Sequence, residues 1–152
     1  MPAARIFIDA NVFLYARDAS LDKRGAAAAE WLRLLTIADR GRSNLQVINE
    51  VTNVMLRKRQ DLSPLQIFAE IDGLRPFGTT PIGEPTVDAA RMIRVSTQYS
   101  WWDCLLLASA LELGCTHFLS EDMQSGQTVS NGTQDLTIVD PFAHSPGQLL
   151  TP

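Results

Sequence analysis

The chain has 152 residues, a formal net charge of −4 and 45% hydrophobic residues, which is typical of one globular domain that can bury its own core. No apolar run approaches the roughly 20 residues that span a bilayer, and the run after Arg5 is too short for a signal peptide, so we expect a cytoplasmic protein. The negative charge argues against a non-specific nucleic-acid coat. All 13 Lys and Arg residues lie at or before Arg94 and six acidic residues follow it, so a nucleic-acid surface must come from the first two thirds.

The first element is a short apolar run that ends at a carboxylate. Residues 6–8 read Ile-Phe-Ile, which predicts a strand buried on both faces. Asp9 follows at once, where the sites of open α/β sheets lie. Asp9 or Asn11 can equally be the cap of the next helix, which is expected over 12–16. A loop at 18–22 follows.

Two amphipathic helices are predicted next. A helix over 23–38 has an apolar stripe, and Gly41 is expected to end it; the stripe consists of Ala27, Trp31, Leu34, Leu35 and Ala38. Ser43 and Gln46 fit a capping box for a helix over 44–59. In that helix Glu50 lies at the edge of the apolar face, too far from the cap to belong to it. The helix ends in Arg57, Lys58 and Arg59, which suit the negative end of its dipole.

The remaining elements alternate between helices and strands. Helices are predicted over 63–74 and 87–95, with a short strand over 77–80 between them. Ser100 and Asp103 fit a capping box for a helix that is apolar almost all round, over 101–114. Strands are predicted over 116–119 and 136–139, separated by a polar segment with an Asn131-Gly132 turn. We expect one domain over 1–142 and a loose tail over 143–152.

The two cysteines are not expected to form a disulfide. Eleven positions separate Cys104 from Cys115, or about 16 Å along a helix. A disulfide requires Cα atoms within about 7 Å. Both are expected to be small buried hydrophobes in a reducing compartment.

The alternation of strands and helices predicts an α/β fold with a mostly parallel sheet. We expect a three-layer α/β/α sandwich. Helix starts and the carboxyl ends of strands share one edge of such a sheet, so Asp9, Asp103 and Asp122 are expected to converge there. Glu50 would reach in from a flanking helix, and Glu121 could replace its neighbour Asp122.

Each carboxylate also has a simpler interpretation. Asp103 can complete the cap begun by Ser100, Asp122 can be a turn residue, and Glu50 can reach water. Jointly these readings are weaker, because clustered carboxylates repel one another and raise one another's pKa. Such a cluster needs a cation, and oxygen ligands suit Mg²⁺ or Mn²⁺. Zinc is disfavoured, because His117, His144 and the cysteines lack ligand spacing.

At this point the chain resembles the PIN domain family, and most closely the VapC-type toxin ribonucleases. The resemblance covers nearly the whole chain and rests on four motifs in order, with a similar closing strand over 136–142. The motifs are Ile8-Asp9-Ala10-Asn11, Val47-Ile48-Asn49-Glu50, Trp102-Asp103-Cys104-Leu105 and Leu119-Ser120-Glu121-Asp122. The segment 124–127 departs from the family pattern, which leaves the shape of the substrate entrance open.

The resemblance implies a Mg²⁺- or Mn²⁺-dependent endoribonuclease, the toxin of a toxin–antitoxin pair. It maps an acidic catalytic quartet onto Asp9, Glu50, Asp103 and Asp122. Asp9, Asp103 and Asp122 are the expected metal ligands, while Asn11 and Ser120 would orient ligands or phosphate oxygens. It also implies an antitoxin partner and a homodimer. The stripe on helix 23–38 belongs either to the antitoxin contact or to the core.

Two other classes of function fit the sequence less well than a nuclease. A receiver or related phosphatase places two adjacent acids after its first strand and a Lys after a late strand, and this chain has neither. A non-catalytic PIN-like binding module would not need the intact quartet. RNA contacts from Arg57, Lys58 and Arg59 are one interpretation of those residues, and a solvated helix end is the other. Stacking of bases on Tyr15, Trp101 or Trp102 is a further option, with core packing as the alternative.

Overall fold

The centre of the fold is a five-stranded sheet in the order β2-β1-β3-β5-β4. The computed structural model describes residues 3–18 and 22–150. Its strands are β1 (Ile6–Ile8), β2 (Gly41–Arg42), β3 (His117–Leu119), β4 (Thr128–Ser130) and β5 (Asp135–Val139). Four strands run parallel and β4 is antiparallel to β5, which confirms the predicted mostly parallel sheet.

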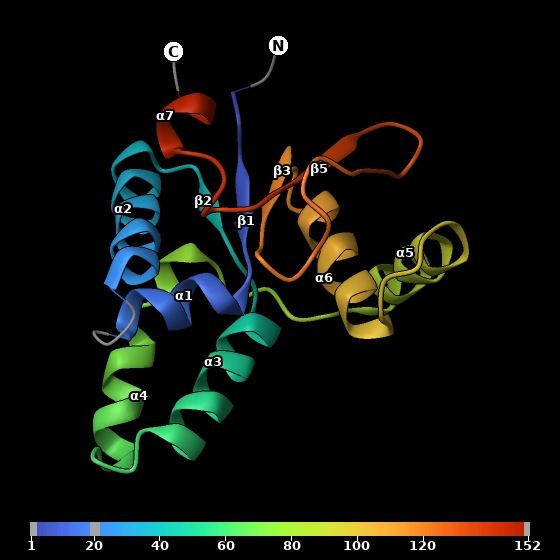
Figure 1. Ribbon diagram of the computed structural model, residues 1–152. Helices are drawn as coiled ribbons and strands as arrows, with labels where there is room; N and C mark the ends of the chain where they lie inside the picture. Colours follow the sequence, from blue (N-terminus) through green and yellow to red (C-terminus); the bar gives the residue numbers. More distant parts are fainter. Residues whose placement is uncertain (1–2, 19–21, 151–152) are drawn as a thin grey trace.

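Helices cover both faces of this sheet (Figure 1). They are α1 (Ala10–Arg17), α2 (Asp22–Ala38), α3 (Leu45–Lys58), α4 (Pro64–Asp72), α5 (Glu84–Ser96), α6 (Trp101–Glu112) and α7 (Pro146–Leu149). In the sheet, β2 lies on one side of β1 and β3 lies on the other side. The connection from β1 to β2 and the connection from β2 to β3 therefore run in opposite directions across the sheet. Right-handed crossovers therefore place α1 and α2 on one face and α5 and α6 on the opposite face. This is the expected three-layer sandwich.

The buried strands and α6 form the core. Every residue of β1 is fully buried, and Phe7 stacks on Phe118 of β3 with ring centroids 5.1 Å apart. Eight consecutive residues of α6, from Cys104 to Leu111, are buried. Cys104 and Cys115 are both buried free thiols, as expected. Within the described ranges, no helix is long and apolar enough to cross a membrane.

The predicted stripe on α2 is divided between core and surface. Trp31 and Leu35 are buried, whereas Ala38 is exposed. The indole of Trp31 donates a hydrogen bond to the Pro141 carbonyl at 2.9 Å. These two residues are therefore core, and α2 also contacts α7, within the segment that was expected to be a loose tail. The predicted loop includes residues 19–21, which lie outside the described ranges.

Three local predictions were wrong. Residues 77–80 do not form a strand, because Pro76 has no N–H and Gly78 has a φ of 133°, which breaks an extended run; residues 75–77 form a 3₁₀ turn instead. Gly41 does not end α2. That helix ends at Ala38, followed by Asp39 at a φ of 54°, and Gly41 lies in β2, a strand that was not predicted.

The cap of α3 was also assigned to the wrong residue. The side chain of Asn44 accepts from the Val47 N–H at 3.0 Å and donates to Ser109 at 2.8 Å. Ser43 instead donates to the Ile8 carbonyl at 3.2 Å. The predicted capping box of Ser43 and Gln46 is therefore absent, because Ser43 ties β1 to the start of α3.

Candidate active site

The candidate site lies where β1 and β3 end, at the carboxyl edge of the sheet. Asp9 follows β1 directly, and its N–H donates to the Leu119 carbonyl of β3 at 3.1 Å. The Asp9 side chain caps α1, accepting from the Ala10 N–H at 2.7 Å, and is only 6% exposed. Asp9 is therefore both a helix cap and a buried carboxylate at the sheet edge.

Ser120 connects the ends of the two strands. Its hydroxyl donates to Oδ2 of Asp9 at 2.8 Å and accepts from Nδ2 of Asn11 at 3.0 Å. The N–H of Asp122 donates to the same hydroxyl oxygen at 3.2 Å. Because both acceptor positions are used by Asn11 and Asp122, the hydroxyl proton is directed at Asp9.

Asn11 brings Asp122 into this network. Its Nδ2 also donates to Oδ2 of Asp122 at 3.1 Å. Asp122 itself is exposed, unlike Asp9. The structure thus joins Asp9, Asn11, Ser120 and Asp122 by direct hydrogen bonds at the edge of the sheet where Asp9 and Asp122 were expected to meet.

Glu50 and Asp103 approach this network from α3 and α6. Asp103 lies in the first turn of α6, where its N–H donates to the Ser100 side chain at 3.1 Å. Burial is the largest cause that raises the Asp103 pKa, and the charge of Asp122 adds to it. Burial likewise raises the Glu50 pKa, with Asp103 adding to the shift. The two carboxylates are therefore within electrostatic reach of the site.

The pKa of Asp9 lies far above its ordinary value. Burial raises its pKa from 3.8 to about 7, against the opposing effect of the hydrogen bonds from Ser120 and Ala10. The charges of Glu50 and Asp103 raise it further. Burial makes ionisation of this carboxylate unfavourable, and a bound cation would offset that cost. Asp9 is therefore a good candidate for a metal ligand.

The carboxylates are neighbours, but they do not form a closed coordination shell. Over residues 3–18 and 22–150, no three His, Cys, Asp or Glu side chains are gathered into a group that could hold a metal ion. The expected convergence is thus looser than a preformed metal site. The donors present are carboxylate, amide and hydroxyl oxygens, which fit Mg²⁺ or Mn²⁺.

Gln46 is a site residue that the sequence interpretation misassigned. Its Nε2 is buried, and no acceptor lies at full hydrogen-bond geometry in the described part of the chain. The amide still acts on Glu50, whose pKa it lowers by hydrogen bonding. Gln46 is therefore directed at Glu50, beside the acidic residues. The expected capping box of Ser43 and Gln46 had assigned this amide to the start of the helix, so its position beside Glu50 was not predicted.

The other predicted residues lie outside this network. Tyr15 and Arg24 engage the side chain of Glu121. His117 is half-buried at the start of β3, next to Thr116, and burial lowers its pKa. Trp102 is 64% exposed immediately before Asp103, so the expectation that it packs in the core was wrong.

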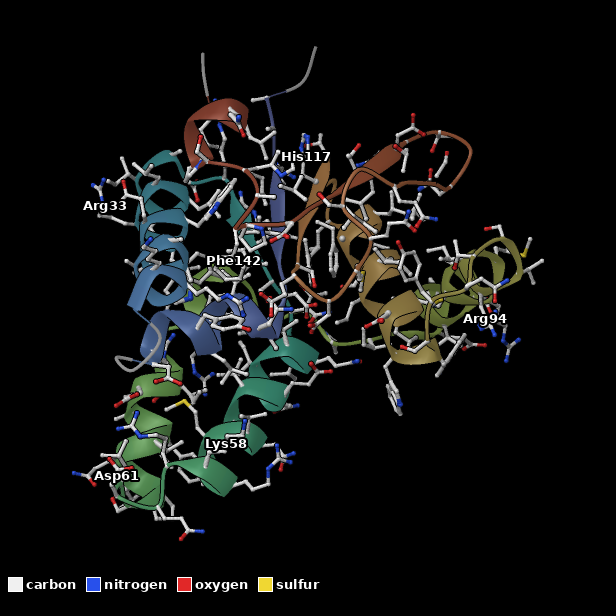
Figure 2. The ribbon with its side chains drawn as sticks, viewed as in Figure 1. Arg33, Lys58, Asp61, Arg94, His117 and Phe142 are labelled. Carbon is white, nitrogen blue, oxygen red and sulfur yellow. The ribbon has the colours of Figure 1, made fainter. Side chains whose placement is uncertain are left out.

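The basic cluster ends α3. Arg57 and Lys58 are exposed, and Arg59 pairs with Asp61 at 3.0 Å. Figure 2 shows Lys58 near the turn that joins α3 to α4, where Asp61 is also labelled. Eight residues separate Lys58 from Glu50, or about 12 Å along the helix. The cluster is therefore beside the site rather than in it.

Comparisons with solved structures identify the fold. A toxin–antitoxin complex from Klebsiella pneumoniae matches with a TM-score of 0.62 and 15% identity, covering 91% of this chain and 98% of that one. FitAcB from Neisseria gonorrhoeae matches with a TM-score of 0.57 and 15% identity, covering 91% and 99%. VapC20 from Mycobacterium tuberculosis, a toxin that cleaves the sarcin–ricin loop, matches with a TM-score of 0.55 and 15% identity, covering 74% and 86%.

Comparisons at the level of sequence give the family. No curated protein matches this chain. The family model of the PIN domain matches residues 6–125, a range that includes Asp9, Glu50, Asp103 and Asp122. The resemblance seen in the sequence motifs is thereby confirmed, and the chain belongs to the PIN domain family.

Proposed function

We propose that this protein is a Mg²⁺- or Mn²⁺-dependent endoribonuclease of the VapC type, the toxin of a toxin–antitoxin pair. One observation carries the proposal: the buried Asp9 carboxylate is held by Ser120 and the Ala10 N–H, and the charged groups that act on it in the described part of the chain are the carboxylates of Glu50 and Asp103. Similar solved structures include a toxin–antitoxin complex and a toxin that cleaves the sarcin–ricin loop. Both names support the proposal by analogy only.

The proposed roles follow from where each side chain lies. Asp9, Asp103 and Asp122 would hold the divalent ion, which when bound supplies an acidified water and neutralises phosphate charge. Glu50 is half-buried with a raised pKa, so it would accept a hydrogen bond from water or complete a second metal site. Ser120 fixes one oxygen of Asp9 and leaves the remaining lone pairs available to a ligand.

Asn11 and Gln46 would orient two of the carboxylates. Asn11 fixes Asp122 through its Nδ2, and the amide of Gln46, which lowers the Glu50 pKa by hydrogen bonding, would hold the Glu50 carboxylate. Water adds to phosphorus as the bond to the 3′ oxygen breaks. One proton of the water passes to solvent or to the Glu50 carboxylate, and the leaving 3′ oxygen takes up a proton from solvent, which gives 5′-phosphate and 3′-hydroxyl ends.

The proposed partners are RNA, an antitoxin protein and a second copy of the chain. Arg57, Lys58 and Arg59 lie about 12 Å from Glu50 along α3, a distance that suits contact with flanking phosphates. Substitution of these cations would weaken RNA binding for all sequences alike and reduce its dependence on salt. A cluster that serves only the helix dipole would leave RNA binding unchanged.

Cleavage of total RNA tests the proposal. Purified native protein and the variants D9N and D88N are incubated with total RNA and Mg²⁺ or Mn²⁺, and the fragment ends are mapped. Asp88 is an exposed carboxylate on α5, so D88N is a matched control. We expect cleavage by the native protein and D88N, loss in D9N, and loss of all cleavage in EDTA.

Two results would contradict the proposal in different ways. Cleavage that persists in D9N would remove Asp9 from the catalytic quartet. A native protein that neither cleaves RNA nor is stabilised by Mn²⁺ would be a binding module of the same fold, because a ligand that binds only the folded state raises its stability.

A further inference from the structure

Four side chains from separate parts of the chain meet beside the candidate site. They are called the Tyr15 cluster here, and they consist of Tyr15 of α1, Arg24 of α2, Glu121 after β3 and Phe142 after β5. Figure 2 labels Phe142 near α1 and α2. The cluster therefore links the two helices on one face of the sheet to the loop that carries Asp122.

The carboxylate of Glu121 is held at both of its oxygens. The Tyr15 hydroxyl donates to Oε1, and Nη1 of Arg24 lies 3.8 Å from Oε2. The Glu121 side chain is 25% exposed, against 59% for that of Arg24. Glu121 is thus turned toward α1 and α2, so both oxygens already have partners that a metal ion would need to displace.

Aromatic rings hold the cation of this cluster in place. The guanidinium carbon of Arg24 lies 5.9 Å from the centre of the Tyr15 ring and 5.7 Å from that of Phe142. The two rings pack edge to face, with centroids 5.1 Å apart. A cation within about 6 Å of aromatic faces is attracted by their quadrupoles, so Arg24 is fixed by more than its exposed ion pair.

The position of Glu121 in the chain gives this arrangement a consequence for the site. Its neighbours are Ser120 and Asp122, which both belong to the hydrogen-bonded network with Asp9 and Asn11. The Glu121 N–H also points to Oδ1 of Asn11, at 3.5 Å. Adjacent side chains leave the backbone in different directions, so holding Glu121 toward α1 turns Asp122 toward Asn11.

We propose that Glu121 is a positioning residue rather than a metal ligand, and that Tyr15 and Arg24 hold it so that the loop presents Asp122 to the site. This inference rests on the proposed nuclease function, because it assigns Asp122 as the fourth acid of that site. It separates two adjacent carboxylates that the sequence motif alone leaves interchangeable.

The variants E121Q and E121A separate positioning from ligation. The amide oxygen of Gln accepts the Tyr15 hydrogen bond but supplies no charge for a metal ion, whereas Ala supplies neither. We expect E121Q to keep kcat within about threefold of native, while E121A and Y15F lose about tenfold or more, as is usual for groups that orient ligands. E30Q is the matched control, because Glu30 also pairs with an arginine, at 2.8 Å.

Binding of Mn²⁺, measured by calorimetry on the same proteins, gives a readout that does not depend on cleavage. We expect E121Q to bind Mn²⁺ like the native protein and D122N to bind it about tenfold or more weakly. Thermal melting confirms that each variant is folded. The double variant Y15F/E121A should lose no more activity than E121A alone, because both changes remove one interaction.

The outcomes distinguish this inference from the function on which it rests. Loss of Mn²⁺ binding in E121Q, or native activity in Y15F, would overturn the positioning role while cleavage by the native protein stands. A native protein that binds Mn²⁺ without cleaving RNA would overturn the proposed function alone, since the Mn²⁺ affinities of E121Q and D122N still report on positioning. A native protein that does not bind Mn²⁺ would overturn both.

Discussion

The buried Asp9 carboxylate should make the metal-free protein less stable as the pH rises, and D9N should remove that dependence. The pKa of Asp9 is about 7 in the folded protein, mainly through burial, and its ordinary value is 3.8. Between these values the folded state retains a proton that the unfolded chain has released. The stabilisation from this group is therefore complete below about pH 4 and is lost as the pH rises to about 7.

The magnitude follows from the size of that difference. At about 1.4 kcal/mol per pH unit, the native protein loses about 4 kcal/mol over the whole range and about 3 kcal/mol between pH 5 and pH 7. In D9N the side chain has one acceptor oxygen instead of two, so either the Ala10 N–H or the Ser120 hydroxyl loses its partner. That loss costs about 1–3 kcal/mol at every pH.

The assay is urea unfolding in EDTA at pH 5, 6, 7 and 8. We expect D9N and the native protein to differ by no more than about 1 kcal/mol at pH 5, and D9N to be about 1–3 kcal/mol more stable at pH 8. The control D88N should follow the native pH profile. A stability difference between D9N and native that stays constant from pH 5 to pH 8 would refute the assignment of a raised pKa to Asp9.

Three further substitutions probe the support of the site. S120A removes the hydroxyl that donates to Asp9, so RNA cleavage should fall about tenfold or more, measured at saturating Mn²⁺ and checked for folding by circular dichroism. N44A removes the cap of α3 and a buried hydrogen bond to α6, so the free energy of unfolding in urea should fall by about 1–3 kcal/mol. N44D keeps the acceptor of the cap and should recover most of that free energy. G78A places a Cβ 2.6 Å from a backbone oxygen at a φ of 133°, so the melting temperature should fall clearly, whereas G147A, where a Cβ meets nothing within 4 Å, should leave it nearly unchanged.

The sequence predicted the elements that carry their own apolar signal. β1, β3 and β5 were expected from runs of buried apolar residues, and α6 from its almost wholly apolar surface. β2 consists of Gly41 and Arg42 and has no such signal. It exists because Ile6 and Phe7 of β1 pair with it, a contact that no local pattern reveals. β4 was missed for the same reason, since only Val129 in it is buried.

The outline of the candidate site could also be predicted from the sequence. Strand ends and helix starts must share one edge of a parallel sheet, so topology alone brings Asp9 and Asp122 together. Hydrogen-bond partners depend on the fold in three dimensions. The sequence therefore left Glu121 and Asp122 interchangeable and assigned Gln46 to a cap, whereas the structure separates the first two and directs the amide of Gln46 at Glu50.

The pairing of β1 with β3 also sets the order in which this protein can fold. Ile6 pairs with His117, and the hydrogen bond from Asn11 to Asp122 spans 111 residues. Closing so large a loop is slow, and the parallel strand pairs cannot stabilise the fold until the loop has closed. During synthesis the first hundred residues can form helices but no part of the network at the sheet edge. A ribosome-bound chain that stops short of β3 would therefore hold Asp9 and Glu50 but lack Ser120 and Asp122, so the hydrogen-bonded network of the site would not yet exist.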